Sequence, residues 1–188
     1  MNSNLIHQRG NFDRAYHRAV WGNRLAHLRH RPNVLLSFYE IRSQLVVTGE
    51  SYRGIREVPV DRIVGSTDRW NDFDTAFRPL RANSADRWVS VACGYTAGRS
   101  LPPVQLYQIA DAYFVRDGHH RVSVARVHDQ SWVDAEVVEV LTIALLPTTQ
   151  ALKPSPLNGS RATGRTLLQR LAEVVAGMGR RTRLLRTP

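Results

Sequence analysis

One short segment concentrates the residues that could do chemistry. Residues 116–129, RDGHHRVSVARVHD, place Asp117, Gly118, two adjacent histidines and Arg121 directly before a valine- and alanine-rich run with helical spacing. The first backbone N–H groups of a helix have no partner inside it, and with the helix dipole they favour an anion. Glycine lets the chain turn sharply and lets a phosphate approach the backbone. The segment therefore predicts a phosphate-binding turn where a strand passes into a helix.

The cationic residues of this turn support the same prediction. His119, His120 and Arg121 would occupy the first helical turn, where the dipole disfavours positive charge unless an anion is bound. The planar guanidinium of Arg121 can hold two phosphate oxygens, and a histidine can donate a hydrogen bond or transfer a proton near neutral pH. Two alternatives stay open. Asp117 could cap the helix while Arg121 pairs with an acidic residue, or Asp117 and the two histidines could ligate a metal ion.

Short apolar runs on both sides of the turn predict the elements that position it. The predicted strands cover residues 57–65, 102–109, 112–117 and 133–140. Ala110-Asp111 is expected to join the second and third of these strands as a hairpin. A helix around Trp88 is expected to end near Gly94 or Gly98, and another helix begins at the phosphate turn. These elements predict a compact α+β domain.

Two helices are predicted ahead of this domain. Residues 12–30 carry apolar side chains at helical spacing, namely Phe12, Tyr16, Val20, Trp21, Leu25 and Leu28. Ser37 and Glu40 form a capping-box pattern that starts a second, shorter helix. We expect an antiparallel pair packed on the domain. A DNA-binding helix-turn-helix is the alternative, although no separate basic recognition face is visible.

Charge is distributed unevenly along the 188 residues. The net charge of +10 divides into +6 for residues 1–56, −3 for residues 57–152 and +7 for residues 153–188. Two basic flanks suit a polyanion such as nucleic acid. Only one of the 26 basic residues is lysine, so a general preference for arginine is the competing explanation.

The last of these segments combines a linker-like stretch with an amphipathic stripe from Leu167 to Met178. The arginines beyond the stripe are the expected nucleic-acid contacts: Arg180, Arg181, Arg183 and Arg186. Packing of the stripe on the domain, or on a second subunit of a homodimer, stays open. Membrane binding is disfavoured because the stripe lacks an aromatic anchor.

No apolar run approaches the roughly 20 residues that span a bilayer, and the N-terminal residues lack the order of a signal peptide. We therefore expect a cytoplasmic protein. The single Cys93 has no partner for an internal disulfide and no second cysteine for a zinc motif.

Residues 57–140 resemble the ParB/sulfiredoxin superfamily in three segments. VPVDRIVGSTDRWNDFD resembles the first strand of that family and its arginine-containing loop, and WVSVACGYTAGRSLPPVQLYQI resembles its helix, glycine and proline-initiated strand. AYFVRDGHHRVSVARVHDQSWVDAEVV resembles its strand, phosphate turn, helix and last strand. The resemblance implies a small mixed sheet with helices over residues 53–141. A helical extension, 1–52, would precede this domain, and a basic linker with a C-terminal helix, 142–188, would follow it.

The resemblance also implies a nucleoside triphosphate, CTP or ATP, bound with Mg²⁺. Asp117, Gly118, His119, His120 and Arg121 would hold the phosphates. In this interpretation Arg69 is a second phosphate contact, Asp68 or Asp72 holds Mg²⁺ or activates a nucleophile, and a histidine acts as acid or transition-state donor. The protein would act on or near nucleic acid, with phosphoryl transfer or nuclease activity as its chemistry.

Departures from the family narrow this hypothesis. His119 stands where sulfiredoxin has its catalytic cysteine, and also where the partition protein has a glutamate after the glycine. Sulfiredoxin chemistry is therefore not expected, and the CTP hydrolysis of partition proteins is in doubt. A nucleotide-switched DNA- or protein-binding module and a small-molecule kinase of the free-serine type stay open as alternatives.

Overall fold

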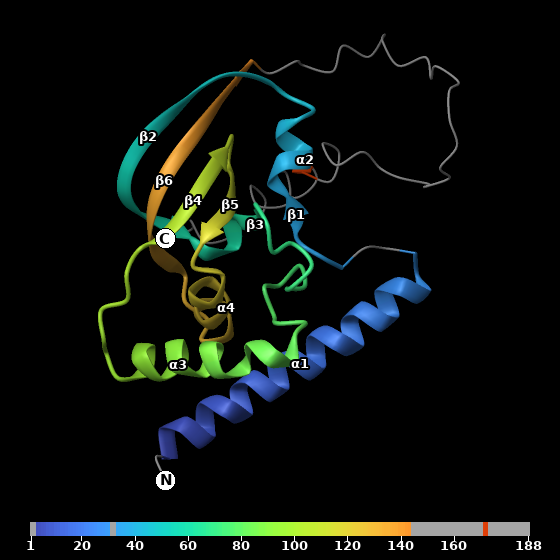
Figure 1. The fold of residues 1–188 in the computed structure, drawn as a ribbon, viewed down its shortest axis with the longest axis vertical. Coiled ribbons are helices and arrows are strands. Elements are labelled where there is room, and N and C mark those ends of the chain that lie inside the picture. The colour runs from blue at the N-terminus through green and yellow to red at the C-terminus, as the bar shows by residue number, and fades with distance from the viewer. Residues whose placement is uncertain (1–2, 31–32, 144–170, 173–188) are drawn as a thin grey trace, which may run out of the picture.

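A six-stranded mixed sheet is the centre of the part of the protein that this computed structural model describes, residues 3–30, 33–143 and 171–172 (Figure 1). Its strands are β1 (Leu36–Ser37), β2 (Val46–Pro59), β3 (Ile63–Ser66), β4 (Val104–Ile109), β5 (Ala112–Asp117) and β6 (Trp132–Ile143). They lie in the order β1-β3-β5-β4-β6-β2. The β4–β5 and β6–β2 pairs are antiparallel and the other neighbours are parallel. The predicted α+β class is confirmed.

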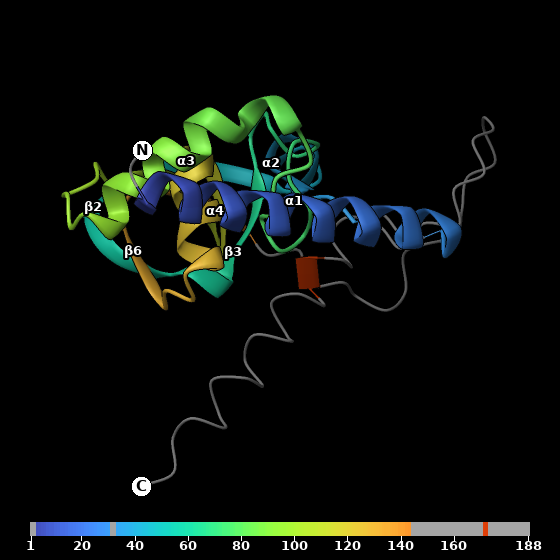
Figure 2. The same cartoon turned by 90° about the horizontal axis from the view of Figure 1, so that it is seen from below.

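Helices are layered on the sheet. They are α1 (Ser3–Leu28), α2 (Phe38–Arg42), α3 (Ala85–Thr96) and α4 (His119–Val127). α4 packs directly on one face of the sheet, α3 lies on α4, and α1 crosses α3 (Figures 1 and 2). α2 lies at the other side of the molecule, next to β1.

Side chains of β4 and β5 point to both faces of the sheet and enter the core on each face. Val104 and Leu106 of β4 contact the cluster that includes Val122 of α4, whereas Ile109 faces the opposite cluster with Phe114 of β5. The opposite cluster is closed by Phe38, Ile41 and Leu171. Burying each large apolar side chain contributes about 2 kcal/mol. Two buried faces explain why β5 is apolar at consecutive positions.

Aromatic packing joins the three stacked helices. Phe12 of α1 meets Trp88 of α3 edge to face, with ring centroids 5.8 Å apart. The buried Trp88 Nε1 donates a hydrogen bond to Ser123 Oγ of α4 at 2.9 Å. Trp88 therefore ties α1 and α3 to α4, the helix that follows Gly118.

The two N-terminal helices differ from the prediction in length and packing. α1 begins at Ser3 rather than residue 12, and the expected antiparallel pair is wrong because α1 packs on α3 while α2 packs at β1. The second half of the expected stripe is not buried: Trp21, Leu25 and Leu28 are 62%, 51% and 79% exposed. This half of α1 extends past the domain, so the sheet and α3 offer it no surface (Figure 2).

The predicted strand 57–65 is interrupted. β2 ends at Pro59, a 3₁₀ turn covers Val60–Arg62, and β3 then continues the chain at a different place in the sheet. β2 also starts as early as Val46 and pairs with β6 along its length. The predicted hairpin at Ala110-Asp111, the strand at 112–117 and the helix at His119 are confirmed.

The packing at Gly65 generates a stability test. A Cβ at Gly65 of β3 would collide with the Phe114 ring and with the Leu36 carbonyl oxygen. We expect Gly65→Ala to lower the free energy of unfolding by about 3 kcal/mol through overpacking. Gly10→Ala is the control, because a Cβ at this position of α1 meets nothing within 4 Å and alanine favours a helix. Equal thermal midpoints for the two variants would contradict the packing of β3 between β1 and β5.

Candidate phosphate-binding site

Gly118 connects β5 to α4 in a left-handed conformation, with φ of +99° and ψ of 22°. A Cβ at this position would lie 2.7 Å from Val104 Cγ1 and 3.0 Å from Arg121 Nε. Positive φ and close packing together require glycine here. The turn predicted from the sequence is therefore built on the residue that the prediction named.

The start of α4 is open. Gly118 precedes the helix without a side-chain cap, and the first backbone bond into the helix runs from Val122 N–H to the Gly118 carbonyl oxygen at 3.0 Å. The N–H groups of His119, His120 and Arg121 thus have no helical acceptor. With the helix dipole they form a region of positive potential.

A hollow of about 380 Å³ lies at this helix start. Its charged and titratable lining residues are Asp68, Arg69, Arg87, Arg116, Asp117, His119, His120 and Arg121. An adjoining hollow of about 270 Å³ shares Arg69, Arg87 and His120 and adds Asp72 and Arg81. The structure thus brings residues predicted from two separate segments, 68–72 and 117–121, into one region.

His119 is held by Ser66. Ser66 Oγ lies 2.7 Å from His119 Nε2 and accepts hydrogen bonds from the backbone N–H groups of Asp68 and Arg69, at 3.3 and 3.0 Å. Because the oxygen already accepts two bonds, its O–H is the group left to donate to Nε2, which places the ring proton on Nδ1. Burial lowers the pKa of His119 from its ordinary value near 6.5 to about 4, against the nearby Asp68 carboxylate. His119 is therefore a neutral residue that fixes the turn after β3.

His120 is buried but incompletely bonded. The residue is 6% exposed, and its Nδ1 is buried without a hydrogen-bond partner among the described residues. Burial, followed by the positive charges of Arg87 and Arg69, lowers the pKa of His120 to about 4. A buried polar atom without a partner is costly, by about 1–3 kcal/mol. His120 therefore has bonding capacity that the described side chains leave unused.

Arg121 is engaged with its own chain. Its guanidinium donates to Asp117 Oδ2 at 2.5 Å, to the Pro103 carbonyl oxygen at 2.8 Å and to the Pro102 carbonyl oxygen. The ion pair with Asp117 is the alternative to phosphate binding that the sequence also allowed. Arg121 ties the segment before β4 to the start of α4, and it shapes the wall of the hollow.

Three other arginines carry the unpaired positive charge. Arg69, Arg87 and Arg116 form no ion pair with any acidic side chain in the described part of the chain. Arg116 lies over the Tyr107 ring, 5.8 Å from its centroid. Arg69 was predicted from the sequence, whereas Arg87 and Arg116 were not. The position of Arg116 next to Asp117 was a usable signal, whereas Arg87 comes from α3 and only the tertiary fold brings it here.

The loop of residues 67–81, hereafter the 67–81 loop, is fixed by a buried carboxylate. Asp74 Oδ1 accepts hydrogen bonds from the backbone N–H groups of Ala76 and Arg78, at 2.9 and 2.8 Å. Burial raises the pKa of Asp74, while these bonds and the Arg78 charge act in the opposite direction. The loop therefore has a fixed shape from which Arg69 and Asp72 extend.

The two acidic residues predicted for Mg²⁺ lie in adjoining hollows. Asp68 is two-thirds exposed, with Oδ1 3.6 Å from His119 Nε2, whereas Asp72 Oδ1 accepts a bond from Arg81 Nε at 3.2 Å. No group of three or more His, Cys, Asp or Glu side chains in the described residues could hold a metal by itself. Mg²⁺ bound mainly through phosphates needs only one or two carboxylates, and Asp68 fits that requirement.

Other predicted residues fall elsewhere. Cys93 lies on α3 and does not line the hollow. Arg180, Arg181, Arg183 and Arg186 lie outside the described residues. None of the helices that the structure describes is long and apolar enough to cross a membrane.

Comparison with known proteins adds a fold likeness. No family model matches the chain, and no curated protein matches it. The solved structure of sulfiredoxin from Arabidopsis thaliana is similar over 44% of this chain and 82% of that chain, at 14% identity and a TM-score of 0.34.

The buried histidines predict a pH dependence of stability. Because the pKa of His119 is about 4 in the folded protein and near 6.5 when unfolded, the unfolded chain binds more protons between these values. The contribution of His119 to the free energy of unfolding is therefore present above pH 6.5 and is lost on acidification. The loss for His119 is about 2 kcal/mol between pH 7 and pH 5. Thermal midpoints measured over this range without nucleotide or Mg²⁺ should fall.

His119→Gln should make this fall shallower, because glutamine keeps an acceptor near Ser66 but does not titrate. His17→Gln, at an exposed position of α1, is the matched control and should leave the fall unchanged. The account of His119 is wrong if the two variants respond to pH alike.

Proposed function

We propose that the hollow at the start of α4 binds the phosphate groups of a nucleotide, and that the protein is a nucleotide-binding protein acting on or near nucleic acid. The observation that carries this proposal is the incompletely bonded, buried His120. It lines the same hollows as the unpaired Arg69 and Arg87, at an open helix N-terminus. Backbone donors, an imidazole and two guanidinium groups converge there, and all of them suit an anion.

Charge balance favours an anion with more than one negative charge. Arg69, Arg87 and Arg116 lack acidic partners among the described residues. The hollow at α4 is lined by two carboxylates, and of these Asp117 pairs with Arg121 whereas Asp68 pairs with no arginine. Arginines grouped at the positive end of a helix repel one another and the dipole. A polyphosphate removes this repulsion more completely than a carboxylate does.

Each group has a role in this proposal. The N–H groups of residues 119–121 would hold one phosphate, and Arg69 and Arg87 would contact it from the 67–81 loop and from α3. Arg116 would reach a second phosphate from the end of β5. Asp68 would hold a Mg²⁺ ion, which bridges phosphate oxygens and withdraws negative charge from them when bound. CTP and ATP are the first candidates.

The geometry favours binding over turnover. Of the four residues proposed for catalysis, His119 is hydrogen-bonded to Ser66 and Asp72 is paired with Arg81. A nucleotide-switched binding module is therefore the first candidate function. Phosphoryl transfer or phosphodiester cleavage is the second, favoured by the exposed Asp68 carboxylate at the rim, which could activate a nucleophile.

Arginine variants test the site. Arg69→Gln and Arg87→Gln should each weaken binding of MgCTP, MgATP or inorganic triphosphate by about tenfold or more, because each removes a charge-assisted hydrogen bond. Arg53→Gln is the control, since Arg53 pairs with Glu139 on the far strands β2 and β6. Isothermal titration calorimetry gives the affinities, and assays of released phosphate on the same samples separate binding from turnover.

The ligands are to be tested at about 100 times a micromolar dissociation constant. The proposal is contradicted if neither inorganic triphosphate nor any of the four ribonucleoside triphosphates binds at that concentration. An equal loss of affinity in Arg53→Gln would also contradict it.

A further inference from the structure

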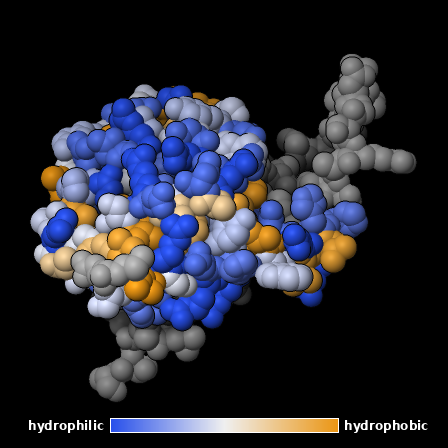
Figure 3. Space-filling view, turned by 60° about the horizontal axis from the view of Figure 1, so that its bottom comes forward, coloured by the Kyte–Doolittle hydropathy of each residue, from blue (hydrophilic) through white to orange (hydrophobic). Residues whose placement is uncertain are grey.

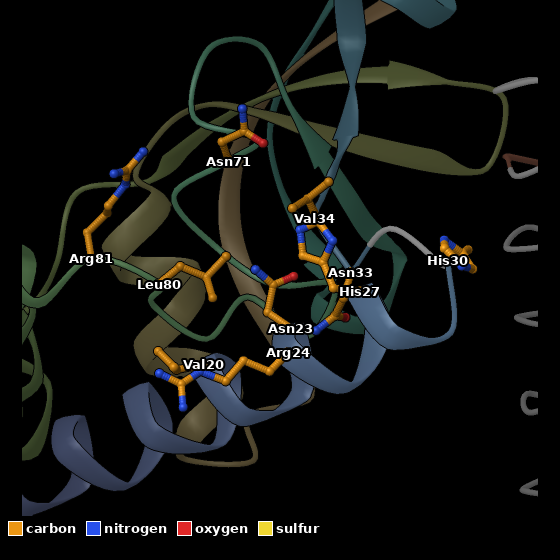
Figure 4. A pocket seen from close by; sticks show the side chains of 10 residues that line it. All are labelled: Val20, Asn23, Arg24, His27, His30, Asn33, Val34, Asn71, Leu80 and Arg81. Carbon is orange, nitrogen blue, oxygen red and sulfur yellow. The ribbon is translucent and has the colours of Figure 1, made fainter. Parts of the chain in front are cut away.

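A larger concave surface lies outside the phosphate site. It is a hollow of about 750 Å³ between the second half of α1, the segment before β1 and the 67–81 loop (Figure 4). Seven of its ten lining residues are arginine, histidine or asparagine, and none is acidic. We call it the α1 groove, defined by Arg24 and His27 of α1 and by Asn71 and Arg81 of the loop. Its lining suits a ligand that is negatively charged and rich in hydrogen-bonding groups.

The α1 groove connects with the phosphate site through arginines. Arg81 lines the groove and also the 270 Å³ hollow, which shares Arg69 and Arg87 with the hollow at α4. Three adjoining hollows therefore follow one another, with an arginine at each junction. Cations that follow one another along a path match the repeated phosphates of a polynucleotide better than a single small anion.

Few carboxylates interrupt this path. Asp72 is paired with Arg81, and Arg24 has no acidic partner among the residues that the structure describes. α1 contributes further charge, because Asp13 is its one acidic residue and it carries several exposed arginines. Asp72 therefore offsets the charge of Arg81, whereas the charge of Arg24 is not offset by any acidic side chain in the described part of the chain.

An exposed aromatic ring lies beside the groove. Trp21 is 62% exposed, and the Arg24 guanidinium stacks over its ring at 5.3 Å from the centroid. Aromatic rings next to arginines are the surfaces on which unpaired bases stack. A base held in a duplex cannot reach such a ring, so the combination favours a single strand. On the face of the molecule that includes α1, small hydrophobic patches lie among hydrophilic side chains (Figure 3).

We propose that the α1 groove binds a single-stranded nucleic acid, whose phosphates contact Arg24 and Arg81 and one of whose bases stacks on Trp21. The strand continues past Arg87 toward the start of α4. This inference rests on the nucleic-acid part of the proposed function, and it moves the contact from the C-terminal arginines to the folded domain.

Binding of labelled oligonucleotides to the full-length protein tests the proposal. The probes are oligo(dT), oligo(U) and a DNA duplex of about 20 nucleotides, measured by fluorescence anisotropy between about 50 and 200 mM salt. Arg24→Gln combined with Arg81→Gln should weaken single-strand binding at least tenfold. The slope of log affinity against log salt should become shallower by about 1.4, since two phosphate contacts are lost at about 0.7 each.

The matched control removes the same charge outside the groove. Arg18→Gln combined with Arg29→Gln changes two exposed arginines of the same helix region that do not line the groove. This variant should lose less than about threefold in affinity, because non-specific attraction alone is reduced. Similar losses in the two double variants would overturn the proposal.

Trp21→Ala tests the stacking contact. It should weaken single-strand binding by about fivefold or more with the salt slope unchanged, whereas Leu25→Ala on the same exposed face should have no effect. Duplex binding should be insensitive to Trp21→Ala. A homodimer that Trp21→Ala dissociates, with oligonucleotide affinity unchanged, would overturn the proposal in favour of a second copy of the chain on this face.

Nucleotide binding measured on the same variants keeps the two proposals apart. Trp21→Ala should retain MgCTP or MgATP affinity within about threefold, because Trp21 lines neither the hollow at α4 nor the adjoining 270 Å³ hollow. Nucleotide binding without any single-strand binding at about 50 mM salt overturns the groove alone. Single-strand binding that depends on the groove, without nucleotide binding, supports the groove and overturns the nucleotide site.

Discussion

The left-handed turn at Gly118 is the constraint on which the site depends. Its missing side chain lets the backbone pass close to Val104 of β4 and to the Arg121 guanidinium, so α4 begins directly at the end of β5. A side chain at this position would push the helix start away from the sheet. The open N–H groups, the two buried histidines and the Arg121 contacts to the segment before β4 all follow from where this turn places α4.

Burial then determines what the histidines can do. Both rings are excluded from water by α4 and by Phe73 of the 67–81 loop, with which they make aromatic contacts, and both are neutral at pH 7. His119 uses its Nε2 to organise the turn after β3. His120 keeps a ring nitrogen without a partner among the described residues, in a hollow that arginines from other elements also line. One residue of the pair therefore holds the turn after β3, and the other is the one that the proposed function assigns to the ligand.

The sequence predicts those parts of the fold that local chemistry specifies. The bounds of β4, β5 and α4 are predicted to within a few residues. The signals are the apolar runs on each side of Ala110-Asp111 and the glycine between a strand and a helix. β2 is harder to predict because it is largely exposed, so its residues 46–56 lack an alternating apolar pattern. Trp21, Leu25 and Leu28 were predicted to be buried and are exposed. Apolar residues at helical spacing do not reveal that the helix extends past its domain. Arg87 could not be assigned from sequence, because only the packing of α3 on α4 brings it to the site.

The measurement that tests the central claim most directly is a titration of the isotope-labelled, full-length protein with inorganic triphosphate, followed by amide NMR. If the start of α4 binds phosphate through its free donors, the amide resonances of His119, His120 and Arg121 should shift first and furthest. The ring nitrogens of His120 should shift with them, while those of His119 should change little. Shifts confined to other basic surfaces, with the amides of residues 119–121 unmoved at saturation, would contradict the account.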